Sequence, residues 1–264
     1  MNGVRHYLLA LQFFTRMPVT GRLAEWVGFS PQMLRASAAH FPGVGWLVGG
    51  VGAAVFVLAL HGLPGTAGAL AAALLSMAAT VLLTGAFHED GLADVADGLG
   101  GASDRNRALE IMKDSRIGAF GAIALVLALG LKTVLLASMA GQGAAALACG
   151  IAGAHVLSRL APLFLIRWLP YVGDSGASKA KPLADAIGSG ALLVGVLWSL
   201  PAVALVLLTQ GPARTIAVVL ACALAALAMA RMFRRRLQGF TGDGLGATQQ
   251  VCELAIYLAL AWQA

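Results

Sequence analysis

Acidic residues gather in one short stretch of an otherwise apolar chain. Asp90, Asp94 and Asp97 follow one another at intervals of four and three residues, so a helix over residues 87–98 would carry all three carboxylates on one narrow stripe. This acidic stripe is the part of the chain best suited to chemistry. Residues 87–121 as a whole hold seven of the twelve Asp and Glu residues: Glu89, Asp90, Asp94, Asp97, Asp104, Glu110 and Asp114.

Such a stripe predicts a divalent cation as its partner. Three like charges on one helix face repel each other, and a bound cation removes that cost. Carboxylate oxygens are hard ligands that suit Mg²⁺, Mn²⁺ or Ca²⁺. We therefore expect Asp90, Asp94 and Asp97 to be metal ligands, with Glu89, about 100° around the helix, as a further ligand. The alternative is a solvated acidic face, which the scarcity of charge elsewhere in the chain disfavours.

The composition predicts a polytopic membrane protein. Of the 264 residues, 59% are hydrophobic and only 11% are charged, and the mean hydropathy is +0.83. Soluble domains carry about 25% charged residues. The expected fold is an all-α bundle of transmembrane helices, with residues 1–264 as a single catalytic domain. The net charge of +6 does not indicate nucleic-acid binding, because the basic residues fall in the loops between apolar segments.

Seven apolar segments are the expected membrane spans. The last of them is short for a full span unless it begins inside the preceding loop. Residues 7–14 are also apolar, but a span needs about 20 residues. We expect this short piece to lie at the membrane interface or to pack against the bundle. The seven segments are residues 44–60, 66–87, 119–140, 144–169, 187–208, 215–232 and 251–264.

The basic residues support this count and give an orientation. Fifteen of the 18 Lys and Arg residues fall in the N-terminal segment, in the loops 88–118, 170–186 and 232–250, or at the span ends that border them. Seven spans place all of these segments on one side of the membrane, and the positive-inside rule makes that side cytoplasmic. The acidic stripe is therefore expected at the cytoplasmic end of the bundle.

A second helix is expected after the stripe. Gly98, Gly100 and Gly101 should break the first helix, and Ser103 is a good N-cap for the next one, which would end near residues 115–118.

Two basic residues near the end of that second helix could bind a phosphate. Lys113 and Arg116 stand one helical turn apart, and a guanidinium binds phosphate oxygens in a bidentate manner. The alternative is that basic residues here only set the topology. For Arg105 and Arg107 we prefer that alternative.

Residues 239–246 form a glycine-rich loop on the same side. Four glycines in eight residues allow close approach of the backbone to a ligand, and exposed N–H groups there, Gly242 included, can bind an anion. Thr241 adds a hydroxyl group. Asp243 could join the metal ligands or orient an attacking alcohol. The alternative is a plain turn before the last helix.

Four ionisable residues lie inside apolar spans, where charge is costly and is usually functional or paired. Arg159 lies toward the cytoplasmic end of its span and is a candidate for substrate binding. Lys132 is deeper, and a structural ion pair is as good an interpretation as catalysis. His155 is interpreted as a satisfied interior histidine. For Glu253 both interpretations stay open.

These motifs together resemble the cobalamin synthase family, the adenosylcobinamide-GDP ribazoletransferases. The likeness covers nearly the whole chain. The acidic core shows no departure from the family pattern, whereas Gly244 stands where a threonine or similar residue is expected. The matching segments are residues 88–98 (HEDGLADVADG), 111–121 (IMKDSRIGAFG), 13–18 (FFTRMP), 41–45 (FPGVG) and 241–247 (TGDGLGA).

The resemblance implies a phosphotransferase in the bacterial plasma (inner) membrane. Its donor would be adenosylcobinamide-GDP, its acceptor α-ribazole or α-ribazole 5′-phosphate, and its cofactor Mg²⁺. A ribose hydroxyl would attack the phosphorus on the cobinamide arm, and GMP would leave. The implied partners are these small molecules and the lipid bilayer, and the question of a homo-oligomer stays open.

The resemblance also implies roles for single residues. Lys113 and Arg116 would bind phosphate oxygens of the donor. Asp114 and Asp243 are both candidates for orienting or deprotonating the acceptor hydroxyl. The residues that would hold Mg²⁺ on the pyrophosphate are Glu89, Asp90, Asp94 and Asp97.

Two other classes of protein compete with this interpretation. A CDP-alcohol phosphotransferase carries a related Asp-Gly pattern but has an arginine at the position of Asp94. An ion-coupled transporter uses buried acids as an ion path, but it would carry them inside the spans rather than at one end of the bundle.

Overall fold

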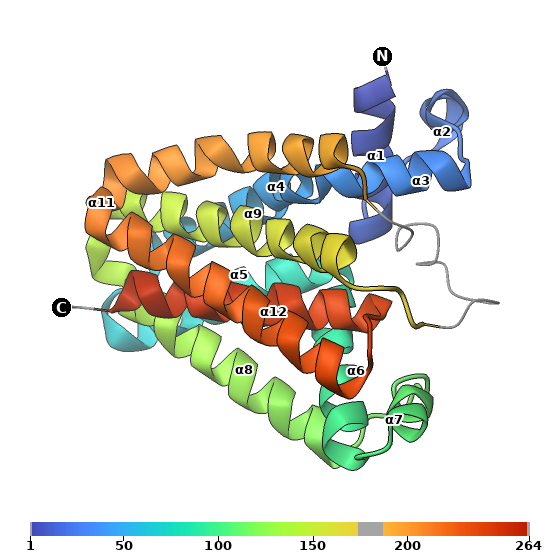
Figure 1. Cartoon of the computed structure of the whole chain (residues 1–264). Coiled ribbons are helices and arrows are strands. Elements are labelled where there is room, and N and C mark those ends of the chain that lie inside the picture. Colours follow the sequence, from blue (N-terminus) through green and yellow to red (C-terminus); the bar gives the residue numbers. More distant parts are fainter. Residues whose placement is uncertain (1, 174–186, 263–264) are drawn as a thin grey trace.

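The computed structural model describes residues 2–173 and 187–262, which form a bundle of helices (Figure 1). Within these residues the only β-type pairing is an isolated bridge between Tyr171 and Phe240. The prediction of an all-α fold is confirmed. The helices are α1 (Asn2–Phe14), α2 (Gly21–Val27), α3 (Pro31–Ser37), α4 (Phe41–Gly62), α5 (Gly65–Thr84), α6 (Phe87–Gly101), α7 (Arg105–Ile111), α8 (Ala119–Ser138), α9 (Ala144–Trp168), α11 (Ser189–Arg236) and α12 (Gly242–Ala261).

Five helices of the described chain are long and apolar enough to cross a membrane. They include α4, α5, α8, α9 and α11, and they confirm the prediction of a multi-pass membrane protein. α11 doubles back at Gly211, whose φ of 80° suits a residue without a side chain. Its two arms therefore correspond to the predicted spans 187–208 and 215–232 (Figure 1). α12 covers the last predicted span but is not among the five, so the count of seven stays a prediction.

α9 is the centre of the bundle. Its most apolar window is 78% buried, against at most 44% for the other four candidate spans. Glycines let α4 approach it closely: a Cβ at Gly45 would come within 2.6 Å of the His155 carbonyl oxygen, and one at Gly49 within 2.8 Å of the Ala152 Cα. Membrane helices commonly approach each other over such small residues. The polar side chains of α9 are consequently surrounded by protein.

α1 runs across the ends of the long helices and packs against the bundle, as predicted for its apolar piece (Figure 1). It buries Leu9, Leu11 and Phe14. The Phe14 ring meets the Phe41 ring at the start of α4 edge to face, with centroids 4.1 Å apart. This contact brings the aromatic end of α1 to the beginnings of α4 and α6.

The predicted break after the acidic stripe comes only at Gly101, where α6 ends, and the prediction is wrong for Gly98 and Gly100, through which the helix continues. These glycines serve close packing. A Cβ at Gly98 would lie 2.8 Å from the Ala108 carbonyl oxygen of α7, and one at Gly100 would lie 2.6 Å from the Phe120 ring of α8. The missing side chains thus let two neighbouring helices approach α6.

The second predicted helix is also shorter and capped differently. α7 begins at Arg105 and ends at Ile111, rather than near residues 115–118. Its N-cap is Asp104 and not Ser103, since the Asp104 Oδ1 accepts a hydrogen bond of 2.9 Å from the Arg107 N–H. A carboxylate at this position satisfies an otherwise unpaired helix amide and complements the helix dipole.

Candidate active site

The acidic stripe lies on α6, which is helical over the whole predicted segment, and it faces the start of α12. Glycines on both helices allow this contact. A Cβ at Gly91 would lie 2.7 Å from the Asp243 carbonyl oxygen, and one at Gly246 would lie 3.3 Å from the His88 Cα. Both distances are shorter than ordinary van der Waals contact, so the glycines bring Asp243 of the glycine-rich loop next to the stripe.

Asp90, Asp94 and Asp243 form a convergent group of acids. Burial, and then the charges of Asp243, Asp90 and Asp97, raise the pKa of Asp94 to about 7. Burial and the charge of Asp90 raise the pKa of Asp243 to about 6. Like charges at short range disfavour ionisation in this way. Burial is the largest cause of both shifts, and repulsion between the carboxylates adds to it.

The donor chemistry of this group fits a divalent cation. Its oxygens are hard ligands, and its raised pKa values show a repulsion that a cation would relieve. In residues 2–173 and 187–262, however, no three His, Cys, Asp or Glu side chains converge tightly enough to form a ready metal site.

Asp97, the third member of the stripe, is held by backbone amides. Its Oδ2 accepts a hydrogen bond of 2.7 Å from the Gly118 N–H, and its Oδ1 accepts one of 2.8 Å from the Gly121 N–H. Both amides belong to the first turn of α8, where N–H groups lack helical partners. Asp97 therefore ties α6 to α8, a role that its place in the stripe did not reveal.

We expect Asp97→Asn to lower stability. An amide group has one acceptor oxygen, so its NH₂ would face one of the two N–H donors. Hydrogen bonds to a charged group are worth about 1.5–3 kcal/mol, which corresponds to a melting temperature several degrees lower. The measurement is thermal unfolding in detergent without divalent cations. Asp90→Asn is the matched control, because the exposed Asp90 makes no such tie and its replacement relieves repulsion. Equal melting temperatures for the two variants would contradict this role.

Glu89 lies apart from the convergent acids. It is buried, and its Oε1 accepts a hydrogen bond of 3.0 Å from the Gln250 Nε2 of α12. Its other oxygen, Oε2, has no hydrogen-bond partner among the described residues. The structure thus brings Asp90 and Asp94 together with Asp243, and directs Glu89 into the contact between α6 and α12.

The glycine-rich loop is an ordered helix start. Thr241 is the N-cap of α12, and its Oγ1 accepts a hydrogen bond of 3.1 Å from the Gly244 N–H. The preceding residue is fixed too, because the Phe240 N–H donates to the Pro170 carbonyl oxygen at 2.9 Å. Gly242 is the first residue of the 20-residue helix. The positive end of the helix dipole therefore points toward the acids, where it suits a phosphate.

The predicted phosphate-binding residues lie on the linker between α7 and α8. Arg116 is 87% exposed, and its Nη2 pairs with the Asp114 Oδ2 at 2.5 Å. The hydrogen bonds from Arg116 lower the pKa of Asp114 to about 2. Asp114 is therefore a weak base, which favours Asp243 as the residue that accepts a proton. Lys113 is exposed on the same linker, and Gly118, two residues beyond Arg116, contacts Asp97.

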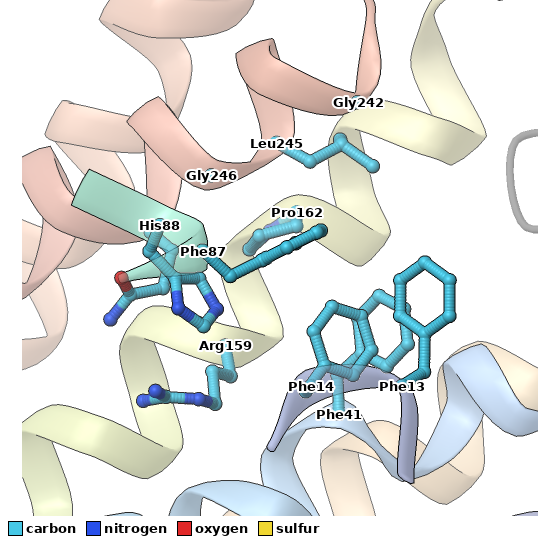
Figure 2. A pocket seen from close by; sticks show the side chains of 11 residues that line it. Phe13, Phe14, Phe41, Phe87, His88, Arg159, Pro162, Gly242, Leu245 and Gly246 are labelled. Carbon is cyan, nitrogen blue, oxygen red and sulfur yellow. The ribbon is translucent and has the colours of Figure 1, made fainter. Parts of the chain in front are cut away.

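An enclosed aromatic cavity adjoins the start of α12 (Figure 2). Phenylalanine side chains from α1, α4 and α6 form much of its wall, and Gly242 and Gly246 lie at its edge. Arg159 of α9 also lines it and is only 4% exposed. Arg159 thus lines the same cavity as Gly242 and Gly246 of the glycine-rich loop, and its role in substrate binding stays a prediction.

A family model described as cobalamin-5-phosphate synthase matches residues 6–261. The chain belongs to this family. An adenosylcobinamide-GDP ribazoletransferase of Albidiferax ferrireducens is 60% identical over 98% of both chains. Proteins of the same name from Polaromonas sp. and Shewanella amazonensis are 58% and 44% identical, covering 98% and 96% of this chain and 96% and 94% of their own. No solved structure matches the chain.

Behind the acids, this member of the cobalamin-5-phosphate synthase family has a buried polar network. Lys132 of α8 forms an ion pair with Glu253 of α12, and the Gln249 Nε2 donates to the Glu253 Oε2 at 2.6 Å. The Arg159 Nη1 lies 3.0 Å from the His155 Nδ1. The network favours the structural interpretation of Lys132 and Glu253, and it agrees with His155 as a satisfied interior histidine.

Sequence reasoning missed three residues near the acids: His88, Gln249 and Gln250. The signal was present in the glutamine pair, because two adjacent amides at the edge of an apolar segment need partners. Gln250 donates to Glu89, and Gln249 donates to Ser158 at 3.0 Å as well as to Glu253. His88 was harder to recognise as a site residue, because it directly precedes the acidic residues that drew attention to this segment.

Proposed function

We propose that this protein joins adenosylcobinamide-GDP to α-ribazole or its 5′-phosphate and releases GMP, the final assembly step of cobalamin. Membership of the cobalamin-5-phosphate synthase family and the names of its relatives support this function. The structural observation that carries it is the meeting of Asp90, Asp94 and Asp243 at the first turn of α12. Acids for a cation and helix amides for phosphate are the main requirements of phosphoryl transfer.

The reaction exchanges a phosphoanhydride bond of the donor for a phosphate ester. The acceptor's ribose oxygen forms a bond to the phosphorus attached to the cobinamide arm, while the bond from that phosphorus to the oxygen of GMP breaks. The hydroxyl proton passes to a base. Asp243 suits this role because burial and Asp90 raise its pKa to about 6, near the pH at which it would work.

Mg²⁺ is the proposed cofactor. Asp90 and Asp94 would hold it, while the buried Glu89 faces Gln250 of α12 and Asp243 is left to accept the proton. When bound, the ion supplies neutralisation of charge on the pyrophosphate and on the departing GMP. The backbone N–H groups of Gly242 and its neighbours would bind phosphate oxygens of the donor. Lys113 and Arg116 would bind the phosphate oxygens that this helix start does not contact. Asp97 would keep the stripe in position through its tie to α8.

The deciding experiment is turnover in reconstituted vesicles. Purified protein with adenosylcobinamide-GDP, α-ribazole and Mg²⁺ should release GMP in step with cobalamin formation. Parallel reactions with a CDP-linked alcohol should release no CMP. Absence of GMP release in the complete mixture would reject the proposed function.

We further propose seven spans in the bacterial plasma membrane, with the acids on the cytoplasmic side. Single cysteines at Ser103 and Thr241, in a variant without native cysteines, should react with a membrane-impermeant maleimide only after the cells are opened. A cysteine at Gly141, in the short turn at the opposite end of α8, should react in intact cells whose outer membrane has been permeabilised. Ser178, a third predicted cytoplasmic position, lies outside the described residues. Labelling of Ser103 or Thr241 positions in intact cells would reject this topology.

A further inference from the structure

The aromatic cavity beside the first turn of α12 has no part in the phosphoryl chemistry described so far. Its wall contains Phe13, Phe14, Phe41 and Phe87, which come from α1, α4 and α6. The three rings of Phe13, Phe14 and Phe41 gather on one side, and Phe87 extends toward them (Figure 2). Gly242 also lines the cavity, and Asp243 is the next residue of α12.

The rings surround a narrow space. Phe87 meets Phe13 and Phe14 edge to face, with centroids 5.7 and 5.6 Å apart. Phe14 and His88 present nearly parallel faces, at 20° and 6.1 Å between centroids. The cavity volume is about 30 Å³, enough for a water molecule but not for an aromatic base. A larger guest therefore needs a wall that yields, and Phe87, which is 38% exposed, can turn outward.

One end of the cavity is polar. Arg159 and His88 lie there, away from the gathered phenylalanine rings (Figure 2), and Gln249 also lines the cavity. The Arg159 Nε is buried and has no hydrogen-bond partner among the described residues. A buried donor without a partner is costly, and a ligand with an acceptor atom would satisfy it.

We propose that this cavity binds the aromatic base of the acceptor nucleoside, with the ring nitrogen of that base accepting a hydrogen bond from Arg159. The inference rests on the proposed function, which supplies an acceptor of this chemical class. The cavity's flat aromatic walls match a planar apolar ring system, and aromatic pairs prefer the offset and edge-to-face contacts seen here. A base bound there would extend its ribose past Gly242 toward Asp243, where the hydroxyl must lose its proton.

Guanine of the donor is the competing guest. Its edge carries two acceptors and an amino group, and the phenylalanine walls would leave most of these groups unpaired, at a cost in binding. The acceptor base has a largely apolar edge with one free ring nitrogen. The apolar walls, together with the unpaired Nε of Arg159, therefore fit the acceptor base better than guanine.

The test compares Phe87→Ala with wild type by calorimetric titration of α-ribazole into the purified protein, without Mg²⁺ and without donor. We expect the variant to bind about tenfold more weakly, a typical loss when an aromatic partner of a stacked base is removed. In turnover, its KM for α-ribazole should rise by a similar factor, while its KM for adenosylcobinamide-GDP should stay within about twofold. Phe164→Ala is the matched control, because Phe164 packs on Trp168 on another face of α9.

A second probe addresses the polar end without any mutation. A nucleoside analogue with a C–H in place of the free ring nitrogen should bind wild type at least fivefold more weakly than α-ribazole. Equal binding of the two ligands would overturn the role of Arg159. A rise confined to the donor KM in Phe87→Ala would assign the cavity to guanine, and unchanged binding and kinetics would overturn the inference as a whole. Absence of GMP release by wild type would instead reject the proposed function, while the titrations would still report on the cavity.

Discussion

Asp94→Asn should abolish most of the Mg²⁺-dependent turnover and should not destabilise the metal-free protein. Asp94 is the acid whose ionisation the site opposes most clearly, since burial and three neighbouring acids raise its pKa to about 7. Replacing it by asparagine keeps the shape and removes one ligand charge. We expect kcat/KM for GMP release to fall on the order of a hundredfold or more, with a weaker apparent affinity for Mg²⁺.

The pH dependence of the unfolding free energy is a second test of the same prediction. Between the ordinary carboxyl pKa of 3.8 and the raised value of about 7, the folded protein holds a proton on Asp94 that the unfolded chain releases. The unfolding free energy of the metal-free protein should therefore decrease as the pH rises through this window, and level off above it. Asp94→Asn should flatten that slope. Adding Mg²⁺ at pH 7 should raise the unfolding free energy of the wild-type protein, and it should raise that of Asp94→Asn much less.

Asp104→Asn is the control for this experiment, since it makes the same chemical change on the next helix. Asp104 caps α7 through the Arg107 amide, and asparagine is an equally good N-cap. Its turnover should stay within about twofold of wild type, and so should its response to Mg²⁺. Near-normal Mg²⁺-dependent turnover in Asp94→Asn would remove the acidic stripe from the mechanism.

The helical stripe could be predicted from sequence because it depends on local spacing. Intervals of four and three residues place Asp90, Asp94 and Asp97 on one face in any α-helix, and the flanking apolar segments fix the bundle around it. The turn within α11 was equally accessible, because Gly211 and Pro212 interrupt a long apolar run. These features follow from residues that are close together in the chain.

The separate roles of the acids on α6 could not be predicted from the sequence, because they depend on contacts between distant segments. Asp97 is separated by 21 and 24 residues from the two amides that it binds, and nothing in its own helix distinguishes it from Asp94. Glu89 meets Gln250 across 161 residues. The glycines of α6 were misread for the same reason, since their close neighbours lie on α7, α8 and α12.

Gly91→Ala should separate activity from stability, because Gly91 sets the distance between the stripe and α12. A methyl group there would lie 2.7 Å from the Asp243 carbonyl oxygen and 3.1 Å from its Cα. These are backbone atoms of a capped helix start, so the two helices must part to relieve the overlap. A displacement of about 1 Å at a reacting centre can cost a hundredfold in rate, and we expect a loss of that order in kcat for GMP release.

The melting temperature of this variant should change much less. Overpacking at a helix contact costs about 1–3 kcal/mol, but alanine is favoured over glycine within a helix by about 1 kcal/mol, and the two effects partly cancel. Gly130→Ala on α8 is the control, because a Cβ at that position meets no atom within 4 Å. It should gain slightly in stability and keep full turnover. If Gly91→Ala instead retained wild-type kcat, α12 could move away from α6 without harm, and Asp243 could not be the base that takes the proton of the acceptor.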